Sequence, residues 1–333
     1  MARLLVIRRN RLGDAVSVLP WLQGLKKARP DLCIHVLTNP YAAAVFQRSS
    51  VVDEVFVLPE EYCGMPIGVL WHPTLRRVRK QATYDYVVHG SYSFSEKAAI
   101  LAYLVPGTWK TGMVSGKGKL LDKVWDVPVY PSADVQAMHQ VMRIAHVGEL
   151  AGLAVSNLPE PILQNHIQPK LHQVALCPSV NRPQSSWPDT HWIALERLLL
   201  KEGYAAVWIG RKPAGTSGEL LETASSDLFF DALASSEVVA CCEGGTSHVA
   251  AALGCQTVVL SGVAIRKTWC PWARHAVVLE RTGAVDAISE HAVMQQIRHL
   301  EAKHQFMVTE HAYLNPWLSE HVDKQADSKM VVP

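Results

Sequence analysis

An aspartate stands in the stretch RRNRLGDAVSVLP (8–20), which directly follows the apolar run LLVI. The apolar run is typical of a buried strand, Gly13 allows a tight turn, and helix-like apolar spacing follows. Asp14 would stand at the start of this helix, where an acid is favoured as a cap. A carboxylate placed there can also serve as a general base. Arg9 and Arg11 either bind an anionic ligand or are simply exposed.

A second stretch, CCEGGTSHVAAALG (241–254), combines glycines, hydroxyls and the start of a small-residue helix. Two adjacent glycines let the backbone approach a ligand closely, and free N–H groups at a helix start attract phosphate. The alternative is an ordinary strand–helix turn with a Thr/Ser cap. The residues of this candidate phosphate site are Gly244, Gly245, Thr246, Ser247 and His248. The preceding Glu243 is placed to hold sugar hydroxyls.

A third polar stretch, CPSVNRPQSSWPDTHW (177–192), also follows an apolar strand pattern and precedes an amphipathic helix. Arg182 and Ser185 lie in this loop, at the carboxyl end of the predicted strand. In parallel sheets ligands bind at that end of the strands. The alternative is a structural loop closed by Trp187 and Pro188.

Several motifs are absent from the sequence. It contains no G-x-x-x-x-G-K-[ST], no G-x-G-x-x-G after a strand, and no G-x-S-x-G. It also contains no D-x-D, and its 15 histidines show no metal-ligand spacing. We therefore expect neither a metal nor an organic cofactor, and the P-loop and dinucleotide-binding classes are disfavoured.

Short β-rich runs alternate with helical patterns in both halves, which predicts an α/β protein with parallel sheets. A proline-rich segment, 156–173, interrupts this alternation and marks a domain boundary. We predict two Rossmann-like domains, 1–160 and 170–310, facing each other across a cleft, and a C-terminal extension, 311–333. The predicted strands are 3–8, 32–38, 54–58, 84–89, 172–177, 204–209, 237–242, 256–260 and 275–279. The predicted helices are 15–28, 40–48, 94–104, 135–152, 189–202, 217–225, 246–253 and 287–305.

Charge and composition restrict the partners. The 333-residue chain is 49% hydrophobic and carries a net charge of only +2, which disfavours nucleic-acid binding. Basic residues nevertheless cluster at 8–11, 26–29, 75–80 and 116–119, which indicates either a solvated surface or contact with phosphates or an anionic membrane. The seven scattered cysteines, the missing signal peptide and the lack of a long apolar segment predict a cytoplasmic protein, soluble or peripheral to a membrane.

Three segments together resemble glycosyltransferase family 9, the lipopolysaccharide heptosyltransferases and their relatives. The N-terminal LLVIRRNRLGDAVSVLPWLQGLKKARPDLCIHVLT is similar to the family's strand, its R-x-x-x-[IL]-G-D turn and the following helix. PSVNRPQSSWPDTHWIAL resembles the loop P-G-A-S-R-P-x-K-x-W-P. EGGTSHVAAALGCQTVVLSG resembles D-T-G-x-x-H-[LI]-A-A-A-L-G-x-P-T-V-x-L-[FY]-G.

The resemblance implies a GT-B fold, with the acceptor on the N-terminal domain and the donor on the C-terminal one. It implies inverting, metal-independent transfer of a heptose-like sugar from a nucleotide sugar such as ADP-heptose. The acceptor would be a lipopolysaccharide core or a related glycolipid or oligosaccharide at the cytoplasmic face of the inner membrane. Asp14 matches the catalytic aspartate, and the turn from Gly245 to His248 matches the diphosphate site. Arg9, Arg11 and Gly13 would contact the acceptor or phosphates.

Two positions depart from the family pattern. Ser185 stands where the family has a lysine, and Glu243 stands where an aspartate is usual. Arg182 can supply the missing cation near the donor phosphates, whereas the longer Glu243 side chain leaves a non-heptose donor open. Two other classes also stay open: a nucleotide-sugar epimerase or hydrolase on the same fold, and a non-catalytic protein that binds sugar nucleotides.

Overall fold

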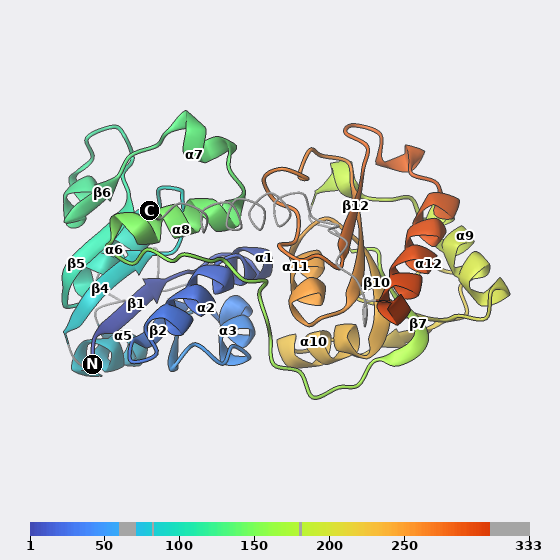
Figure 1. The fold of residues 1–333 in the computed structure, drawn as a ribbon, viewed down its shortest axis with the longest axis horizontal. Coiled ribbons are helices and arrows are strands. Elements are labelled where there is room, and N and C mark those ends of the chain that lie inside the picture. Colours follow the sequence, from blue (N-terminus) through green and yellow to red (C-terminus); the bar gives the residue numbers. More distant parts are fainter. Residues whose placement is uncertain (60–70, 82, 180–181, 307–333) are drawn as a thin grey trace, which may run out of the picture. The chain divides into compact units, whose positions relative to one another are not determined.

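The computed structural model describes residues 1–59, 71–81, 83–179 and 182–306. The chain forms two compact units, one ending at Gln164 and one beginning at Asn165 (Figure 1). This division falls within the proline-rich segment 156–173. The roles assigned to the two domains stay predictions, and the predicted extension 311–333 lies outside the described residues.

The first unit is built on a six-stranded parallel sheet. Its elements are β1 (Arg3–Ile7), α1 (Leu12–Val16), α2 (Leu19–Ala28), β2 (Cys33–Thr38), α3 (Pro40–Gln47), β3 (Glu54–Val57), α5 (Pro73–Gln81), β4 (Tyr84–His89), α6 (Glu96–Leu104), β5 (Gly107–Met113), the 3-10 helix η2 (Leu120–Val124), β6 (Val127–Val129), α7 (Ala133–Ala137) and α8 (Gln140–Leu150). The strands follow the order β3-β2-β1-β4-β5-β6.

The second unit repeats this plan. Its elements are β7 (Lys170–Cys177), the 3-10 helix η3 (Pro183–Ser185), α9 (Asp189–Lys201), β8 (Ala205–Ile209), β9 (Glu219–Leu221), α10 (Ser226–Ala234), β10 (Ser236–Cys242), α11 (Gly245–Ala252), β11 (Gln256–Ser261), β12 (Ala276–Glu280), the 3-10 helix η4 (Val285–Ala287) and α12 (Glu290–Phe306). The strands follow the order β12-β11-β10-β7-β8-β9, and their pairs are parallel. The predicted α/β class is confirmed.

In each sheet the chain reverses its direction of winding at one point. In the first sheet this switch point lies between β1 and β4, and in the second it lies between β7 and β10. In sheets of this kind the loops that leave the two strands pass to opposite faces, and ligands bind at the carboxyl ends of the strands at this point. Asp14 follows β1, whereas Arg182 follows β7 and Glu243 follows β10. The fold therefore places the sequence-predicted residues at the two switch points.

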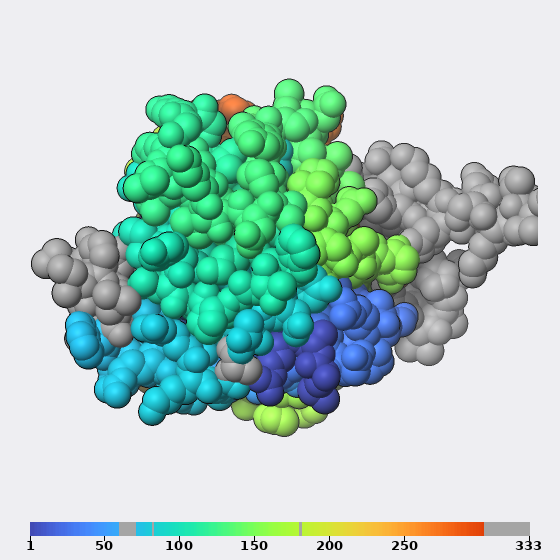
Figure 2. Space-filling view, turned by 90° about the vertical axis from the view of Figure 1, so that its left-hand side faces the viewer, coloured from blue at the N-terminus to red at the C-terminus, as the bar shows by residue number. Residues whose placement is uncertain are grey.

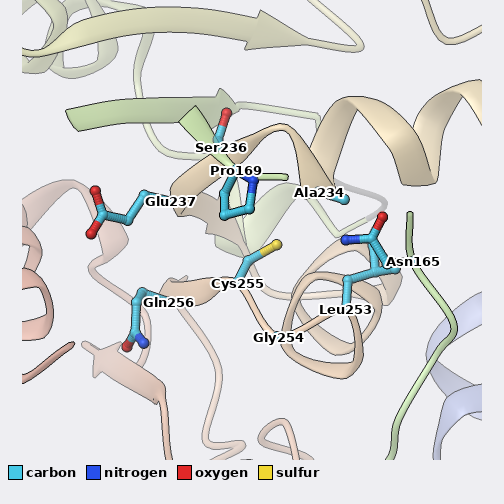
Figure 3. A pocket seen from close by; sticks show the side chains of 9 residues that line it. All are labelled: Asn165, Pro169, Ala234, Ser236, Glu237, Leu253, Gly254, Cys255 and Gln256. Atoms are coloured by element: carbon cyan, nitrogen blue, oxygen red, sulfur yellow. The ribbon is translucent and has the colours of Figure 1, made fainter. Parts of the chain in front are cut away.

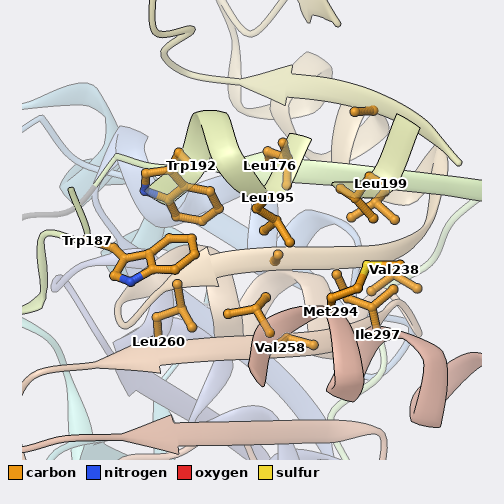
Figure 4. Close-up of a cluster of buried hydrophobic side chains, with 14 of the residues drawn as sticks. Leu176, Trp187, Trp192, Leu195, Leu199, Val238, Val258, Leu260, Met294 and Ile297 are labelled. Carbon is orange, nitrogen blue, oxygen red and sulfur yellow. The ribbon is translucent and has the colours of Figure 1, made fainter. Parts of the chain in front are cut away.

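The core of the second unit fixes the loop that carries Arg182. Trp187 is 1% exposed, its Nε1 donates to the carbonyl of Ile288 at 2.8 Å, and its ring packs edge-to-face on Trp192 (Figure 4). Such an aromatic pair contributes about 0.5–1.5 kcal/mol beyond its burial. Trp187 thus anchors the end of the loop to α9, α12 and the sheet.

Some predicted elements differ from the structure. The predicted helix 217–225 is wrong: the chain forms β9 there, and α10 begins only after Ser225, whose side chain accepts from the N–H of Leu228. The predicted helix 15–28 is two helices, α1 and α2. Strands β5 and β6 and helix α5 were not predicted. Among the helices of the described ranges, none has the length and apolar character that crossing a bilayer requires.

Candidate functional site

The turn after β1 differs from its prediction in one respect. Helix α1 begins at Leu12, with Arg11 in the N-cap position and without a side-chain cap. Gly13 therefore lies buried inside the first helical turn, and the chain direction changes over residues 8–11. Asp14 also belongs to this first turn rather than to the cap. Its carboxylate is free of a capping bond and favourably placed near the positive end of the helix dipole.

Asp14 is instead paired with Arg8, which belongs to the basic cluster 8–11 that we expected on a solvated surface or in contact with phosphates or a membrane. The Arg8 side chain is fully buried, with 0% exposure, whereas that of Asp14 is 24% exposed. Arg8 Nη2 donates to Asp14 Oδ1 at 2.7 Å, and Arg8 Nε donates to the main-chain oxygen of Asp14 at 3.0 Å. A buried charge requires a partner, so the Asp14 carboxylate serves as the counterion of Arg8.

The two other arginines of this turn behave differently. Arg9 is half-buried, and its Nη2 donates to the carbonyls of Leu58 and Pro59, at 2.8 and 3.3 Å. It therefore ties the turn to the end of β3. Arg11 is exposed and remains available to an anionic ligand.

His89 is a further residue at this switch point, and sequence reasoning missed it. It ends β4 opposite Ile7 of β1, is 3% exposed, and stacks on Trp125. Burial, reinforced by the nearby charge of Arg8, lowers the pKa of His89 to about 3. His89 is therefore neutral at physiological pH, and its uncharged ring lies near the buried guanidinium of Arg8.

In the second unit, the turn after β10 has a glycine-specific backbone at Gly244. This residue has φ 145° and ψ −163°, a conformation that side-chain-bearing residues rarely adopt, and it occupies the N-cap position of α11. Gly245 is the first residue of the helix and does not have a positive φ. Gly244, Gly245 and Thr246 are partly exposed. The first free N–H groups of α11 therefore lie at an accessible surface, as an anion site requires.

The next two residues of the predicted site are buried. Ser247 is 1% exposed, and its hydroxyl donates to the carbonyl of Gly244 at 2.8 Å, which closes the first turn of α11. His248 is 4% exposed and packs on Trp269, with ring centroids 4.8 Å apart. In this structure both side chains shape the turn rather than present their polar atoms at its surface.

Glu243 and Arg182 meet at the switch point of the second sheet. Arg182 Nε lies 3.6 Å from Glu243 Oε1, although the two residues follow different strands. The Glu243 side chain is 2% exposed, and its Oε1 accepts no hydrogen bond within the described ranges, while Arg182 is 55% exposed. A buried carboxylate oxygen without a donor is a candidate acceptor for ligand hydroxyls. The exposed guanidinium is a candidate partner for phosphate.

Ser185, which replaces the family lysine, points into the protein. It is 0% exposed, and its Oγ accepts from the N–H of Gly262 at 3.2 Å. The hydroxyl joins η3 to the end of β11 and is not presented to a ligand in this structure. Arg182 is thus the cation of this loop.

Arg211, which follows β8, is a second cation at the same edge of the sheet, and sequence reasoning did not identify it. It forms two hydrogen bonds of 2.7 Å with the carboxylate of Asp189, the first residue of α9. This bond lowers the pKa of Asp189 and raises that of Arg211. Because both side chains are nearly half exposed, the pair is worth at most about 1 kcal/mol.

Other parts of the described chain offer little for a ligand or metal. Within the described ranges, no group of three or more His, Cys, Asp or Glu side chains could hold a metal ion. A small hollow lies at the amino-terminal edge of the second sheet, lined by Ser236, Glu237 and Gln256 among others (Figure 3). Its volume of about 60 Å³ is well below the roughly 300–1,000 Å³ of ligand pockets. It also lies at the edge opposite the candidate site.

Comparisons with known proteins agree with this architecture. The model of glycosyltransferase family 9 (heptosyltransferase) matches residues 73–297, a range that includes the second-unit site but not Asp14. Lipopolysaccharide heptosyltransferase 2 of Salmonella typhimurium is 22% identical over 303 residues, covering 78% of this chain and 82% of that protein.

Two solved structures share the fold. One is a family 9 glycosyl transferase from Veillonella parvula, with a TM-score of 0.75 and 18% identity, covering 91% of this chain and 98% of that chain. The other is the Escherichia coli ADP-heptose lipopolysaccharide heptosyltransferase II, with a TM-score of 0.72 and 18% identity, covering 91% and 99%. With its two Rossmann-like units and this match over most of its length, the chain belongs to glycosyltransferase family 9 and is a glycosyltransferase of the GT-B fold.

Proposed function

We propose that this glycosyltransferase moves a heptose-like sugar from ADP-heptose, or a closely related nucleotide sugar, to a lipopolysaccharide core or similar surface glycan. One observation carries the proposal: the accessible α11 N-terminus, the buried Glu243 carboxylate and the exposed Arg182 guanidinium gather at one switch point. Family membership and the names of the relatives support the choice of donor and acceptor.

The donor diphosphate would lie on the turn Gly244–Thr246. N–H groups at the start of α11 and the guanidinium of Arg182 would stabilise the negative charge that develops on the departing ADP. The buried Glu243 Oε1 would accept hydrogen bonds from hydroxyls of the donor. Because these groups alone can stabilise the leaving group, the proposed reaction is independent of a metal ion.

The acceptor hydroxyl would be activated by Asp14. The carboxylate takes the hydroxyl proton while the acceptor oxygen forms a bond to the anomeric carbon. The bond between that carbon and the phosphate oxygen breaks at the same time, and its electron pair leaves with ADP. Attack opposite the leaving group inverts the anomeric centre.

The first unit offers a surface suited to an acceptor held in a membrane. Leu75 and Val78 of α5 and Ala98 and Leu101 of α6 share one core cluster, so the outer sides of both helices lie on the same face of the sheet. The segment 117–124 lies beside them, because its Leu121 and Val124 pack against the same cluster. The basic–aromatic surface formed in this way consists of Trp71, Arg76, Arg79, Lys80, Lys97, Tyr103, Lys117, Lys119, Leu120 and Lys123, which are all exposed. It also contains the exposed acid Glu96, which pairs with Lys119. Figure 2 shows part of this side of the unit, with the α5 region in cyan and the segment that follows α6 in teal. Lys and Arg beside exposed Trp, Tyr and Leu favour anionic lipid surfaces.

Calorimetric titration with ADP tests the donor site. We expect Arg182→Gln to weaken ADP binding about 10-fold or more, because a charge-assisted hydrogen bond to phosphate is worth about 1.5–3 kcal/mol. Arg197→Gln is the matched control, since Arg197 is exposed on α9. Equal ADP affinity in both variants would place the diphosphate elsewhere.

A further inference from the structure

One guanidinium holds Asp14 at two points. Arg8 Nε donates to the main-chain oxygen of Asp14, and Arg8 Nη2 donates to the carboxylate Oδ1. The first bond fixes the backbone of the first turn of α1, and the second fixes the rotation of the carboxyl group. Together they restrict the side chain to one orientation, as a planar fork of donors can.

The other carboxylate oxygen is left free by this arrangement. Within the described ranges, Asp14 Oδ2 accepts no hydrogen bond, and the side chain keeps 24% exposure. Arg8 therefore occupies the inner oxygen and leaves the outer one for a ligand. A general base requires such an accessible oxygen within reach of the proton that it removes.

Arg8 is fully buried and only partly hydrogen-bonded, which distinguishes its pair with Asp14 from an ordinary surface ion pair. Its side chain is 0% exposed, and its Nη1, like Nδ1 of the adjacent His89, has no hydrogen-bond partner in the described part of the chain. A fully buried cation with unsatisfied N–H groups is costly for folding, and a well-packed apolar side chain often replaces it without loss of stability. A cost of this kind, at a position that orients one carboxylate, indicates a functional role.

We propose that Arg8 is the positioning residue for Asp14: it fixes the carboxylate through Oδ1 so that Oδ2 meets the acceptor hydroxyl. The proposal rests on the role of Asp14 as general base. Arg8 itself transfers no proton and touches neither substrate. Its guanidinium stays charged, as arginine does in proteins.

The test compares four variants, Arg8→Gln, Arg8→Lys, Asp14→Asn and Arg8→Gln/Asp14→Asn, with ADP-heptose as donor and truncated lipopolysaccharide as acceptor. We expect Arg8→Gln to lower kcat by about 10–100-fold, because misplacing a catalytic group by about 1 Å costs up to that much. The KM for ADP-heptose should stay within about twofold, since Arg8 does not contact the donor. Arg8→Lys, which keeps the charge but not the fork, should recover part of the loss.

The double variant is decisive. It should be no slower than Asp14→Asn, because a positioning residue has nothing to position once the base is gone. Arg29→Gln, at the far end of α2, is the control and should retain wild-type kcat.

Three results would overturn the inference: wild-type kcat in Arg8→Gln, wild-type kcat in Arg8→Lys, or additive losses in the double variant. None of these results contradicts the general-base role of Asp14 if the Asp14→Asn variant is slow. An Asp14→Asn variant with wild-type kcat would instead show that Asp14 is not the general base, and the positioning role of Arg8 would then be wrong as well. Thermal unfolding of each variant shows whether it is folded at the assay temperature. If Arg8→Gln does not fold, the Arg8→Lys variant and the Arg8→Lys/Asp14→Asn double variant replace it. Their kcat values are then compared with those of the wild type and of Asp14→Asn in the same way.

Discussion

Asp14 is the counterion of Arg8 and, as we propose, also the general base, and one substitution affects these two roles differently. We expect Asp14→Asn to lower turnover by about 10²–10⁴-fold, the usual effect of losing a general base. Loss of the negative charge beside the buried Arg8 should also lower the free energy of unfolding by about 1–3 kcal/mol. ADP affinity should not change, because the proposed ADP contacts belong to the second unit. Steady-state kinetics, urea unfolding and calorimetry measure the three effects.

Asp31→Asn, which changes an exposed acid of the same unit, is the control for Asp14→Asn. Wild-type turnover in a destabilised Asp14→Asn variant would leave Asp14 with the counterion role alone.

His89 should make the protein sensitive to acid. Because its pKa is about 3 in the folded state and about 6.5 when unfolded, the unfolded state binds the proton first as the pH falls. The contribution of the neutral His89 to the free energy of unfolding is therefore complete above pH 6.5 and is lost as the pH falls towards 3. At about 1.36 kcal/mol per pH unit, the loss between pH 6.5 and pH 5 is about 2 kcal/mol. Urea unfolding of His89→Gln should show a smaller decline, whereas the exposed His166→Gln should follow the wild type. Equal declines in all three proteins would contradict the burial argument.

Two neighbouring glycines at the start of α11, Gly244 and Gly245, differ in backbone conformation. An added Cβ at Gly244 meets no atom within 4 Å, but the backbone there has φ 145°. We therefore expect Gly244→Ala to lower the free energy of unfolding by about 1–3 kcal/mol through backbone strain alone. Gly245→Ala, at a helical position, should be neutral or stabilising and should weaken ADP binding by crowding the first N–H groups. Thermal unfolding and calorimetry compare the two variants, and equal stability would contradict the assignment of strain to Gly244.

The elements also show which patterns predict structure. Strands β1, β10 and β11 are nearly uniformly buried, and each contains a run of at least three consecutive apolar residues, which predicts it from composition. Strand β5, GTWKTGM, contains two glycines and a lysine, and only its position beside β4 in the sheet makes it a strand. Intrinsic β-propensity is weak enough for tertiary packing to override it.

As with the strands, the sequence predicted only part of the candidate site. Strand–turn–helix patterns located Asp14 and the glycine turn, because parallel sheets gather these turns at one edge. The burial of Arg8 and the pairing of Arg211 with Asp189 depend on contacts between separate segments, which periodicity does not report. A charged residue next to an apolar strand is normally exposed, so the sequence left Arg8 either on a solvated surface or in contact with phosphates or a membrane, and neither alternative foresaw its burial against Asp14.

At the scale of the whole molecule, the basic–aromatic surface should bind membranes. We expect the protein to sediment with vesicles containing phosphatidylglycerol but not with phosphatidylcholine vesicles, and salt should weaken the binding. Combined Lys117→Glu and Lys123→Glu should reduce binding about 10-fold or more, since each basic residue near the surface contributes about 1 kcal/mol. Lys201→Glu, in the second unit, is the control. Unchanged sedimentation of the double variant would assign membrane contact to another surface.

Acceptor-dependent release of ADP from ADP-heptose, measured together with the mass of the acceptor, tests the proposed transfer most directly. We expect ADP to appear only when truncated lipopolysaccharide is present, the acceptor to gain one heptose for each ADP released, and EDTA to change neither result. ADP release without acceptor would indicate a hydrolase. ADP-heptose binding without release, under conditions that support a heptosyltransferase of known activity, would indicate a protein that binds the donor but does not transfer it.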